Sequence, residues 1–206
     1  MSPVRLVLAT RNAHKVTELA AILGPLLDGI VLEPLPDAAP DPVEDGDTFA
    51  ANALIKARSA VAFTGLPAIA DDSGISVDAL GGAPGVHSAR YAGTRDDRDN
   101  LELLLANLGA ATDRRAAFWC AAALVLPDGT ELVETRAWPG VVLPAPRGEH
   151  GFGYDPIFQP EGESRSAAEL SPAEKNAVSH RARAFTGLLP GARSALGLDG
   201  GPSLSR

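Results

Sequence analysis

Apolar runs and helix-spaced apolar residues alternate over the first part of the chain, which predicts strands and helices in turn. Residues 4–9 form a compact apolar run rich in β-branched residues and leucine, typical of a buried strand. Apolar residues between 16 and 23 recur at helical spacing, and Gly24-Pro25 ends that helix. Residues 30–35 predict a second strand. This strand–helix–strand order favours a parallel α/β arrangement.

The pattern then predicts one helix and one short strand. Asp47 or Thr48 caps a helix that extends to about residue 63, with an alanine-rich face suited to close packing. Residues 66–70 predict a short strand, and the polar residues 71–74 follow it as a turn. A glycine-rich loop at 81–85 comes next.

The second half of the chain has a different pattern. Residues 99–108 predict a helix. Two long runs, 116–126 and 130–142, flank a Pro-Asp-Gly turn and predict a β-hairpin. Ser171 is a strong helix start, because proline occupies the first helical position after it and glutamate the third.

Chain length and composition indicate a globular protein without a membrane segment. The chain has 206 residues, 45% hydrophobic and 21% charged, and no linker separates independent domains, so residues 1–198 are expected to form one unit and the tail 199–206 to fray. The net charge of −8 disfavours nucleic acid as a partner. No signal peptide or apolar stretch of bilayer length is visible, so we expect a cytoplasmic protein. The single cysteine, Cys120, lies in an apolar run and is expected to be buried.

The polar residues 10–15 stand between the first strand and the first helix. Unpaired backbone N–H groups and the helix dipole attract anions at such a position. Thr10, Asn12 and Lys15 add a hydroxyl, an amide and a charge. The segment is not a P-loop, and both phosphate binding and an ordinary polar turn remain open.

Two acidic segments suggest a metal or acid–base site. Asp71 and Asp72 are adjacent carboxylates at the end of a predicted strand, where α/β sheets bind ligands. One aspartate can face a ligand while the other braces the loop; the alternative is an Asx turn. Asn52 and Lys56 share one helix face, as site residues or as solvated surface. Glu44 is a candidate second magnesium ligand.

Two later segments suggest recognition of an aromatic ring. The glycines around Phe152 allow close backbone approach, so its ring could stack on a base or fold into the core. Lys175 and His180 lie ~140° apart around a continuous helix, too far to share a small ligand. Either the helix is interrupted near Ser179 or the two residues serve different parts of a ligand. We expect an interruption with Ser179 as a new helix cap, although a surface His-Arg pair is the common alternative.

Six segments in this order resemble the inosine triphosphate pyrophosphatase family, the non-canonical purine NTP pyrophosphatases. The resemblance extends from about residue 6 to 185 and rests on the following strings: 8–15, 52–58, 70–74, 81–91, 151–156 and 179–181. It implies an α/β fold with a mixed β-sheet in two lobes, flanking helices, a nucleotide cleft between the lobes, and a homodimer.

The resemblance also implies a role for individual residues. Asp72 would be the catalytic carboxylate and a magnesium ligand, and Glu44 would help to hold Mg²⁺. The residues that would contact the triphosphate or the substrate near it are Thr10, Arg11, Asn12, Ala13, His14, Lys15, Lys56 and Ser73. The residues that would enclose the base are Phe152, Gly153, Tyr154, Asp155, Lys175, His180 and Arg181. Many members carry an acid where this chain has Ala51, which leaves the metal stoichiometry open.

The expected activity is hydrolysis of ITP, dITP and XTP to the monophosphate and pyrophosphate, with Mg²⁺ as cofactor and no nucleic-acid or membrane partner. One alternative is a hydrolase of other modified nucleoside triphosphates, which a nucleotide panel would distinguish. Another is a non-catalytic nucleotide-binding module, which the intact Asp71-Asp72 pair and Lys56 disfavour.

Overall fold

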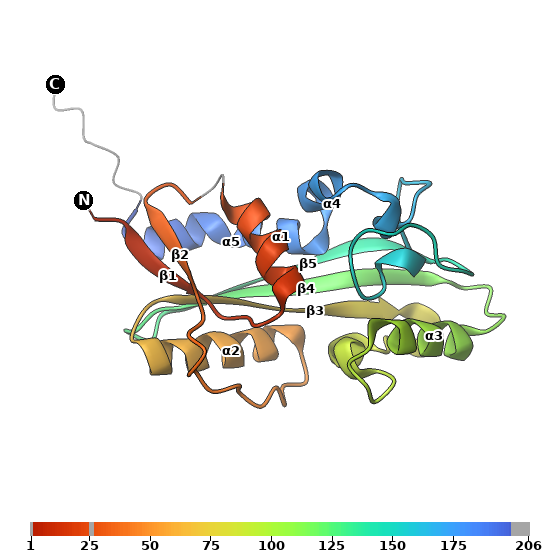
Figure 1. Cartoon of the computed structure of the whole chain (residues 1–206), viewed down its shortest axis with the longest axis horizontal. Coiled ribbons are helices and arrows are strands. Elements are labelled where there is room, and N and C mark those ends of the chain that lie inside the picture. Colours follow the sequence, from red (N-terminus) through yellow and green to blue (C-terminus); the bar gives the residue numbers. More distant parts are fainter. Residues whose placement is uncertain (1, 25–26, 199–206) are drawn as a thin grey trace, which may run out of the picture.

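The computed structural model describes residues 2–24 and 27–198, so the frayed tail predicted at 199–206 lies outside the described residues. Strands and helices alternate as far as α3, and a long hairpin follows (Figure 1). The elements are β1 (Val4–Leu8), α1 (Ala13–Leu23), β2 (Ile30–Pro34), α2 (Phe49–Thr64), β3 (Ala68–Val77), α3 (Asp97–Leu108), β4 (Arg115–Val125), β5 (Glu131–Val142), β6 (Phe158–Pro160), α4 (Pro172–Val178) and α5 (His180–Ala195).

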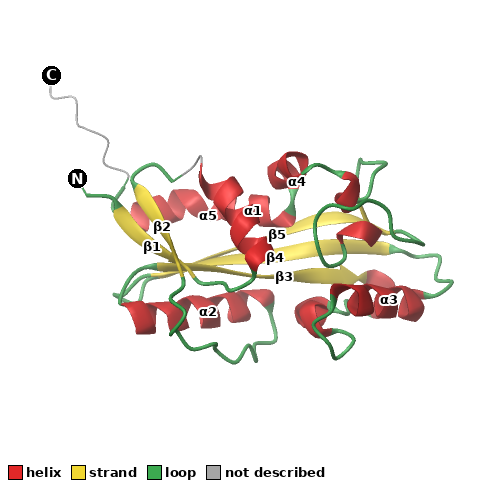
Figure 2. Ribbon diagram, viewed as in Figure 1, coloured by secondary structure: helices red, strands yellow, loops and turns green. Residues whose placement is uncertain are grey.

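The strands form one mixed sheet in the order β2-β1-β3-β4-β5-β6. β1 runs parallel to β2 and β3, as the opening pattern predicts. The pairs β3–β4, β4–β5 and β5–β6 are antiparallel. The fold is therefore α/β with a mixed sheet, in which the long strands β3, β4 and β5 extend along the molecule (Figure 2).

Helices cover both faces of this sheet. Figure 1 shows α1, α4 and α5 on one face and α2 and α3 on the other. The alanine-rich side of α2 is buried, and Ala53, Ala57 and Ala60 allow the helix to pack closely on the sheet. Within residues 2–24 and 27–198, no helix combines the length and hydrophobicity needed to span a membrane.

The polar segment 71–74 of β3 separates two apolar clusters. Ile69 belongs to a cluster that packs α1 and α5 on β1, β3 and β4. Ile75 belongs to a second cluster, which packs α3 and the segment after β5 on β3, β4 and β5. Polar side chains therefore gather where β3 passes from one cluster to the other.

Most predicted elements are confirmed, and β3 is the main correction. The helix capped by Thr48, the β-hairpin and the helix start at Ser171 occur as expected. Ser179 has ψ 162° and separates α4 from α5, so the expected interruption at this residue is confirmed. The prediction that the strand ends at residue 70 with a turn at 71–74 is wrong, because β3 continues to Val77 and pairs with β4 throughout.

Candidate active site

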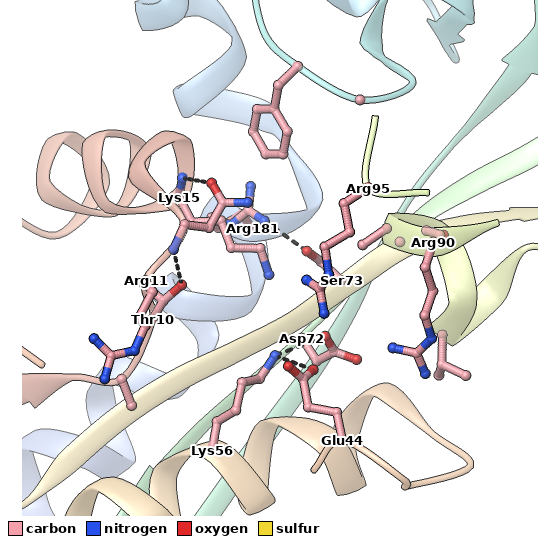
Figure 3. A pocket seen from close by; sticks show the side chains of 18 of the residues that line it. Thr10, Arg11, Lys15, Glu44, Lys56, Asp72, Ser73, Arg90, Arg95 and Arg181 are labelled. Carbon is pink, nitrogen blue, oxygen red and sulfur yellow. Dashed lines mark hydrogen bonds and ion pairs between the residues drawn. The ribbon is translucent and has the colours of Figure 1, made fainter. Parts of the chain in front are cut away.

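A cavity of about 590 Å³ opens beside the polar part of β3 (Figure 3). Of the residues predicted for the site, Ala13 and His14 do not line it. Those that do are Thr10, Arg11, Asn12, Lys15, Glu44, Lys56, Asp72, Ser73, Phe152, Gly153, Tyr154, Asp155, Lys175, His180 and Arg181. Segments far apart in the sequence therefore meet at one cavity.

The strand geometry explains why Asp71 and Asp72 differ. Successive side chains of a β-strand point to opposite faces, so the two carboxylates cannot share one environment. Asp72 lines the cavity on the α2 side, where Lys56 Nζ lies 3.0 Å from its Oδ1 and Asn52 Nδ2 lies 3.3 Å from its Oδ2. Asn52 and Lys56 share one face of α2, as their spacing predicts, and the structure brings both side chains to one carboxylate. Asn52 also accepts a hydrogen bond from Gly46 N at 2.9 Å, which ties the Glu44 loop to the same point.

Asp71 projects to the other face and is fully buried. Its Oδ2 lies 3.0 Å from Lys15 Nζ and 3.1 Å from Arg181 Nη2. Burial alone raises the pKa of Asp71, but Lys15 and Arg181 outweigh burial and hold this pKa well below its ordinary value. Asp71 is therefore an anionic brace for two cations of the site.

The carboxylates of Glu44 and Asp72 converge on one ammonium group. Lys56 Nζ lies 3.0 Å from each of them, and both carboxylates line the cavity. Burial lowers the pKa of Lys56, but the carboxylates of Asp72, Asp71 and Glu44 raise it by more, so the pKa lies above its ordinary value and the group is a cation. The two carboxylates suit Mg²⁺, which is bound through one or two carboxylates together with substrate phosphates and water. Among the described residues, no cluster of three or more His, Cys, Asp or Glu side chains forms a metal site of protein ligands alone.

Most polar groups of the 10–15 segment already have partners. Asn12 Oδ1 accepts hydrogen bonds from the N–H groups of His14 and Lys15 and caps α1. The Arg11 guanidinium faces the loop before α2, where it binds Asp41 Oδ1 at 2.7 Å and the carbonyl oxygens of residues 36, 37 and 39. Arg11 therefore fastens that loop, a role that the sequence pattern does not indicate.

Phe152 lines the cavity and contacts one histidine and two cations. Its ring stacks on His14 with 5.2 Å between ring centroids and 16° between planes. Lys175 Nζ lies 5.0 Å and the Arg181 guanidinium carbon 5.8 Å from the same ring centroid, so both cations are close to the ring. The described structure thus places His14 against Phe152, although His14 does not line the cavity.

The turn that carries Phe152 is held by a buried carboxylate. Asp155 Oδ2 accepts a hydrogen bond from Phe152 N at 2.9 Å and another from Lys175 Nζ. Gly151 has a φ of +75°, and a Cβ there would lie 2.1 Å from Asp155 Oδ2, so a side chain cannot be accommodated. Gly151 is therefore required by the turn itself.

Glu18 connects the cations on this side of the cavity. It accepts hydrogen bonds from Lys175 Nζ at 2.8 Å and from Arg181 Nη1. Burial lowers the pKa of Lys175, but Asp155 and Glu18 raise it above its ordinary value. Lys175 is therefore charged although it is buried.

His180 is an uncharged, buried member of the site. It stacks on Phe118 with 4.8 Å between ring centroids, and its Nδ1 has no hydrogen-bond partner within the described residues. Burial and the nearby charges of Arg181 and Lys175 lower the pKa of His180 well below its ordinary value. Its imidazole is thus neutral at physiological pH.

Several residues at the site were not predicted from the sequence. Glu18 had a usable signal, because it follows Lys15 by one turn on the inner side of α1. Ser88 and Arg90 had a weaker one, since both lie in the segment 81–91 that carries part of the family resemblance. Arg95 and Asp97 had none, because exposed charged residues in a polar stretch resemble ordinary surface. All except Glu18 line the cavity.

Comparisons with known proteins agree on one family. The model of the Ham1 family matches residues 6–190. A protein of Streptomyces avermitilis named dITP/XTP pyrophosphatase is 56% identical over 199 residues, which cover 94% of this chain and 99% of that protein. A Mycobacterium tuberculosis protein of the same name is 53% identical and covers 92% of this chain and 96% of its own length.

Solved structures give the same result. A HAM1 protein from Coxiella burnetii superposes with a TM-score of 0.84 at 43% identity, covering 93% of this chain and 99% of that one. The dITP/XTP pyrophosphatase from Mycobacterium abscessus gives a TM-score of 0.74 at 48% identity, with 92% of this chain and 100% of that one covered. With a matching family model, close relatives and this fold, the chain belongs to the Ham1 family.

Proposed function

We propose that this protein is a nucleoside triphosphate pyrophosphatase that hydrolyses ITP, dITP and XTP to the monophosphate and pyrophosphate. The observation that carries the proposal is the convergence of Asp72, Glu44 and Lys56 with the Phe152 turn at one cavity. Relatives that cover nearly the whole chain are named dITP/XTP pyrophosphatases, which supports this assignment.

In the proposed reaction, water attacks the α-phosphorus and the bond from that phosphorus to the bridging oxygen breaks. Pyrophosphate leaves with the electron pair of that bond. Asp72 orients the water and accepts its proton, while Lys56 holds the Asp72 carboxylate and offsets charge on the phosphate oxygens. Bound Mg²⁺, held by Asp72 and Glu44, would supply further charge neutralisation at those oxygens.

Preference for a 6-oxo purine follows from the remaining hydrogen-bond donors. Lys175 uses two of its N–H groups on Glu18 and Asp155, which leaves one. Arg181 donates to Asp71 from Nε and Nη2, to Ser73 from Nη2 and to Glu18 from Nη1, which also leaves one. Hypoxanthine and xanthine present a 6-oxo acceptor to these two remaining N–H groups. Adenine presents an amino donor there, which would leave these two N–H groups without an acceptor. Guanine also has a 6-oxo group, so its exclusion must come from shape or from the 2-position.

A nucleotide panel tests the assignment. Pyrophosphate release from ITP, dITP and XTP should exceed release from ATP and GTP by a large factor in kcat/KM. Equal efficiencies for all purines would refute the preference for non-canonical bases. Higher efficiency on modified pyrimidine nucleotides would favour the alternative hydrolase.

Asp72→Asn tests the catalytic assignment. Turnover should fall by about 10²–10⁴-fold, the usual contribution of general acid–base catalysis, while nucleotide binding is retained. The matched control is Asp128→Asn, an exposed carboxylate in the hairpin turn between β4 and β5, which should keep full activity. Full turnover of Asp72→Asn would end this assignment, and nucleotide binding without turnover in the unmodified protein would support the non-catalytic alternative.

Mg²⁺ as the divalent ion and the residue roles given above belong to this proposal. The homodimer, the cytoplasmic location, the absence of nucleic-acid and membrane partners, and the single two-lobed unit at 1–198 stay predictions. Size-exclusion chromatography with light scattering tests the dimer directly.

A further inference from the structure

The cations that line the cavity fall into two groups. The first group is already neutralised by carboxylates. Its pairs are Arg11 with Asp41, Lys15 with Asp71, Lys56 with Glu44 and Asp72, Lys175 with Glu18 and Asp155, and Arg181 with Asp71 and Glu18. A polyphosphate would have to share these cations with the protein's own acids.

Arg90 and Arg95 form the second group. Both line the cavity, and neither side chain forms an ion pair or hydrogen bond with any residue in the described part of the chain. Arg90 ends the short 3₁₀ helix η3 (Gly85–Arg90), and Arg95 lies in the loop between η3 and α3. In Figure 3 Arg90 stands to the right of Asp72 and Arg95 extends toward it from above, whereas Thr10, Arg11 and Lys15 stand to its left.

The backbone on both sides of Arg90 is anchored, and Arg95 follows on the loop that leads to α3. The Ser88 hydroxyl accepts a hydrogen bond from Ile75 N at 2.9 Å and donates to Gly85 O at 2.6 Å. Tyr154 donates its hydroxyl to Ser88 O at 2.8 Å, and Ala92 N donates to the buried Asn100 side chain at 2.8 Å. The exposed guanidinium of Arg90 is thus presented to the cavity from a backbone segment that hydrogen bonds hold in place.

We infer that Arg90 and Arg95 form a subsite for the pyrophosphate half of the substrate; this inference rests on the proposed function. Arginine binds phosphate through paired N–H groups, and within residues 2–24 and 27–198 these are the two cavity arginines or lysines whose charge no carboxylate already offsets. Negative charge grows on the leaving pyrophosphate as the bond to the α-phosphorus breaks, so cations on this side favour the transition state.

Binding of inorganic pyrophosphate tests the subsite without turnover. Isothermal titration calorimetry with Mg²⁺ present should show affinity falling about tenfold for Arg90→Ala and for Arg95→Ala, the loss expected for one charge-assisted hydrogen bond of about 1.4 kcal/mol. Affinity for the nucleoside monophosphate IMP should change by less than about twofold in either variant, because IMP lacks the pyrophosphate half. Arg95→Lys should restore part of the affinity, because lysine keeps the charge but not the paired geometry.

The matched control is Arg98→Ala. Arg98 lies on the first turn of α3, pairs with Glu102 and does not line the cavity. Its replacement by alanine changes the net charge by the same amount as the test variants but removes no cation from the cavity. Unchanged pyrophosphate affinity in the double variant Arg90→Ala/Arg95→Ala, an equal loss in Arg98→Ala, an equal loss of IMP affinity, or no pyrophosphate binding by the unmodified protein would each overturn the subsite.

Failure of the proposed function has a different signature. If the unmodified protein releases no pyrophosphate from dITP or XTP while the arginine variants lose pyrophosphate affinity as expected, the proposed function fails and the subsite stands. If turnover occurs and the double variant binds pyrophosphate normally, the subsite fails and the proposed function stands.

Discussion

Replacing Asp71 by asparagine tests whether a buried charge network holds the site together. The Asp71 side chain has no exposed surface, and its Oδ2 lies 3.0 Å from Lys15 Nζ and 3.1 Å from Arg181 Nη2. Asparagine keeps the shape and removes the charge. Arg181 retains Glu18 and Ser73 as partners, whereas Lys15 loses the carboxylate with which it is paired.

The expected loss of stability is large because the remaining cations are buried. Breaking a buried ion pair by removing one partner costs about 3–5 kcal/mol. At roughly 2–4 °C per kcal/mol for a chain of this size, Tm should fall by roughly 6–20 °C.

The same network sets the pH dependence. Lys15 and Arg181 hold the pKa of Asp71 below its ordinary 3.8 in spite of burial. A carboxylate with a lowered folded pKa contributes stability that is fully present above its unfolded pKa and is lost as pH falls through the folded pKa. The difference between the unmodified protein and Asp71→Asn should therefore be constant from about pH 7 to 5 and shrink only in stronger acid.

Urea unfolding followed by circular dichroism and tryptophan fluorescence measures this difference. The matched control is Asp113→Asn, an exposed carboxylate whose pKa is lowered to about 2 by hydrogen bonds from Arg115. That pair is screened by solvent, so no measurable change in the free energy of unfolding is expected. A loss below about 1 kcal/mol in Asp71→Asn, comparable with an ordinary surface change, would refute the argument.

Three further substitutions have distinct expected outcomes. Arg11→Ala should release the loop at 36–41. The divalent-ion concentration needed for half-maximal activity should rise more than KM for the nucleotide, and an unchanged metal requirement would contradict the role of Arg11 in holding this loop. Phe152→Leu should raise KM for dITP by about 5–150-fold through loss of stacking worth ~1–3 kcal/mol, with Tm nearly unchanged; normal steady-state kinetics would argue against base contact. Gly74→Ala should lower stability by about 1–3 kcal/mol, because its Cβ would lie 2.3 Å from Ser88 Oγ, and thermal unfolding checks this.

The sequence pattern predicted the elements that depend on local signals. β1, β2, the hairpin of β4 and β5, and the helix caps at Thr48 and Ser171 follow from apolar spacing and capping residues, which act within a few positions. The break at Ser179 was also expected, because Lys175 and His180 would lie ~140° apart on a continuous helix and Ser179 is a residue type that caps helices.

The pattern failed where charges occupy the interior of a strand. Asp71 and Asp72 look like the end of an apolar run, since burial of an unpaired carboxylate is unfavourable. β3 continues because Lys15 and Arg181 neutralise Asp71 on one face, and Lys56 neutralises Asp72 on the other. These cations come from other elements and are not visible in the local sequence.

The sequence by itself determined the family, most of the elements and the side chains capable of the chemistry, because apolar period, capping and motif order are properties of neighbouring residues. Only the tertiary structure decided how the charges pair. Glu18 meets Lys175 and Arg181, and Arg11 turns to the loop at 36–41, across separations that no local pattern encodes. It also showed that Arg90 and Arg95 face the cavity without carboxylate partners among the described residues. The physical reason is that the free energy of a charge depends on which groups surround it in space, and the packed sheet and helices set those surroundings.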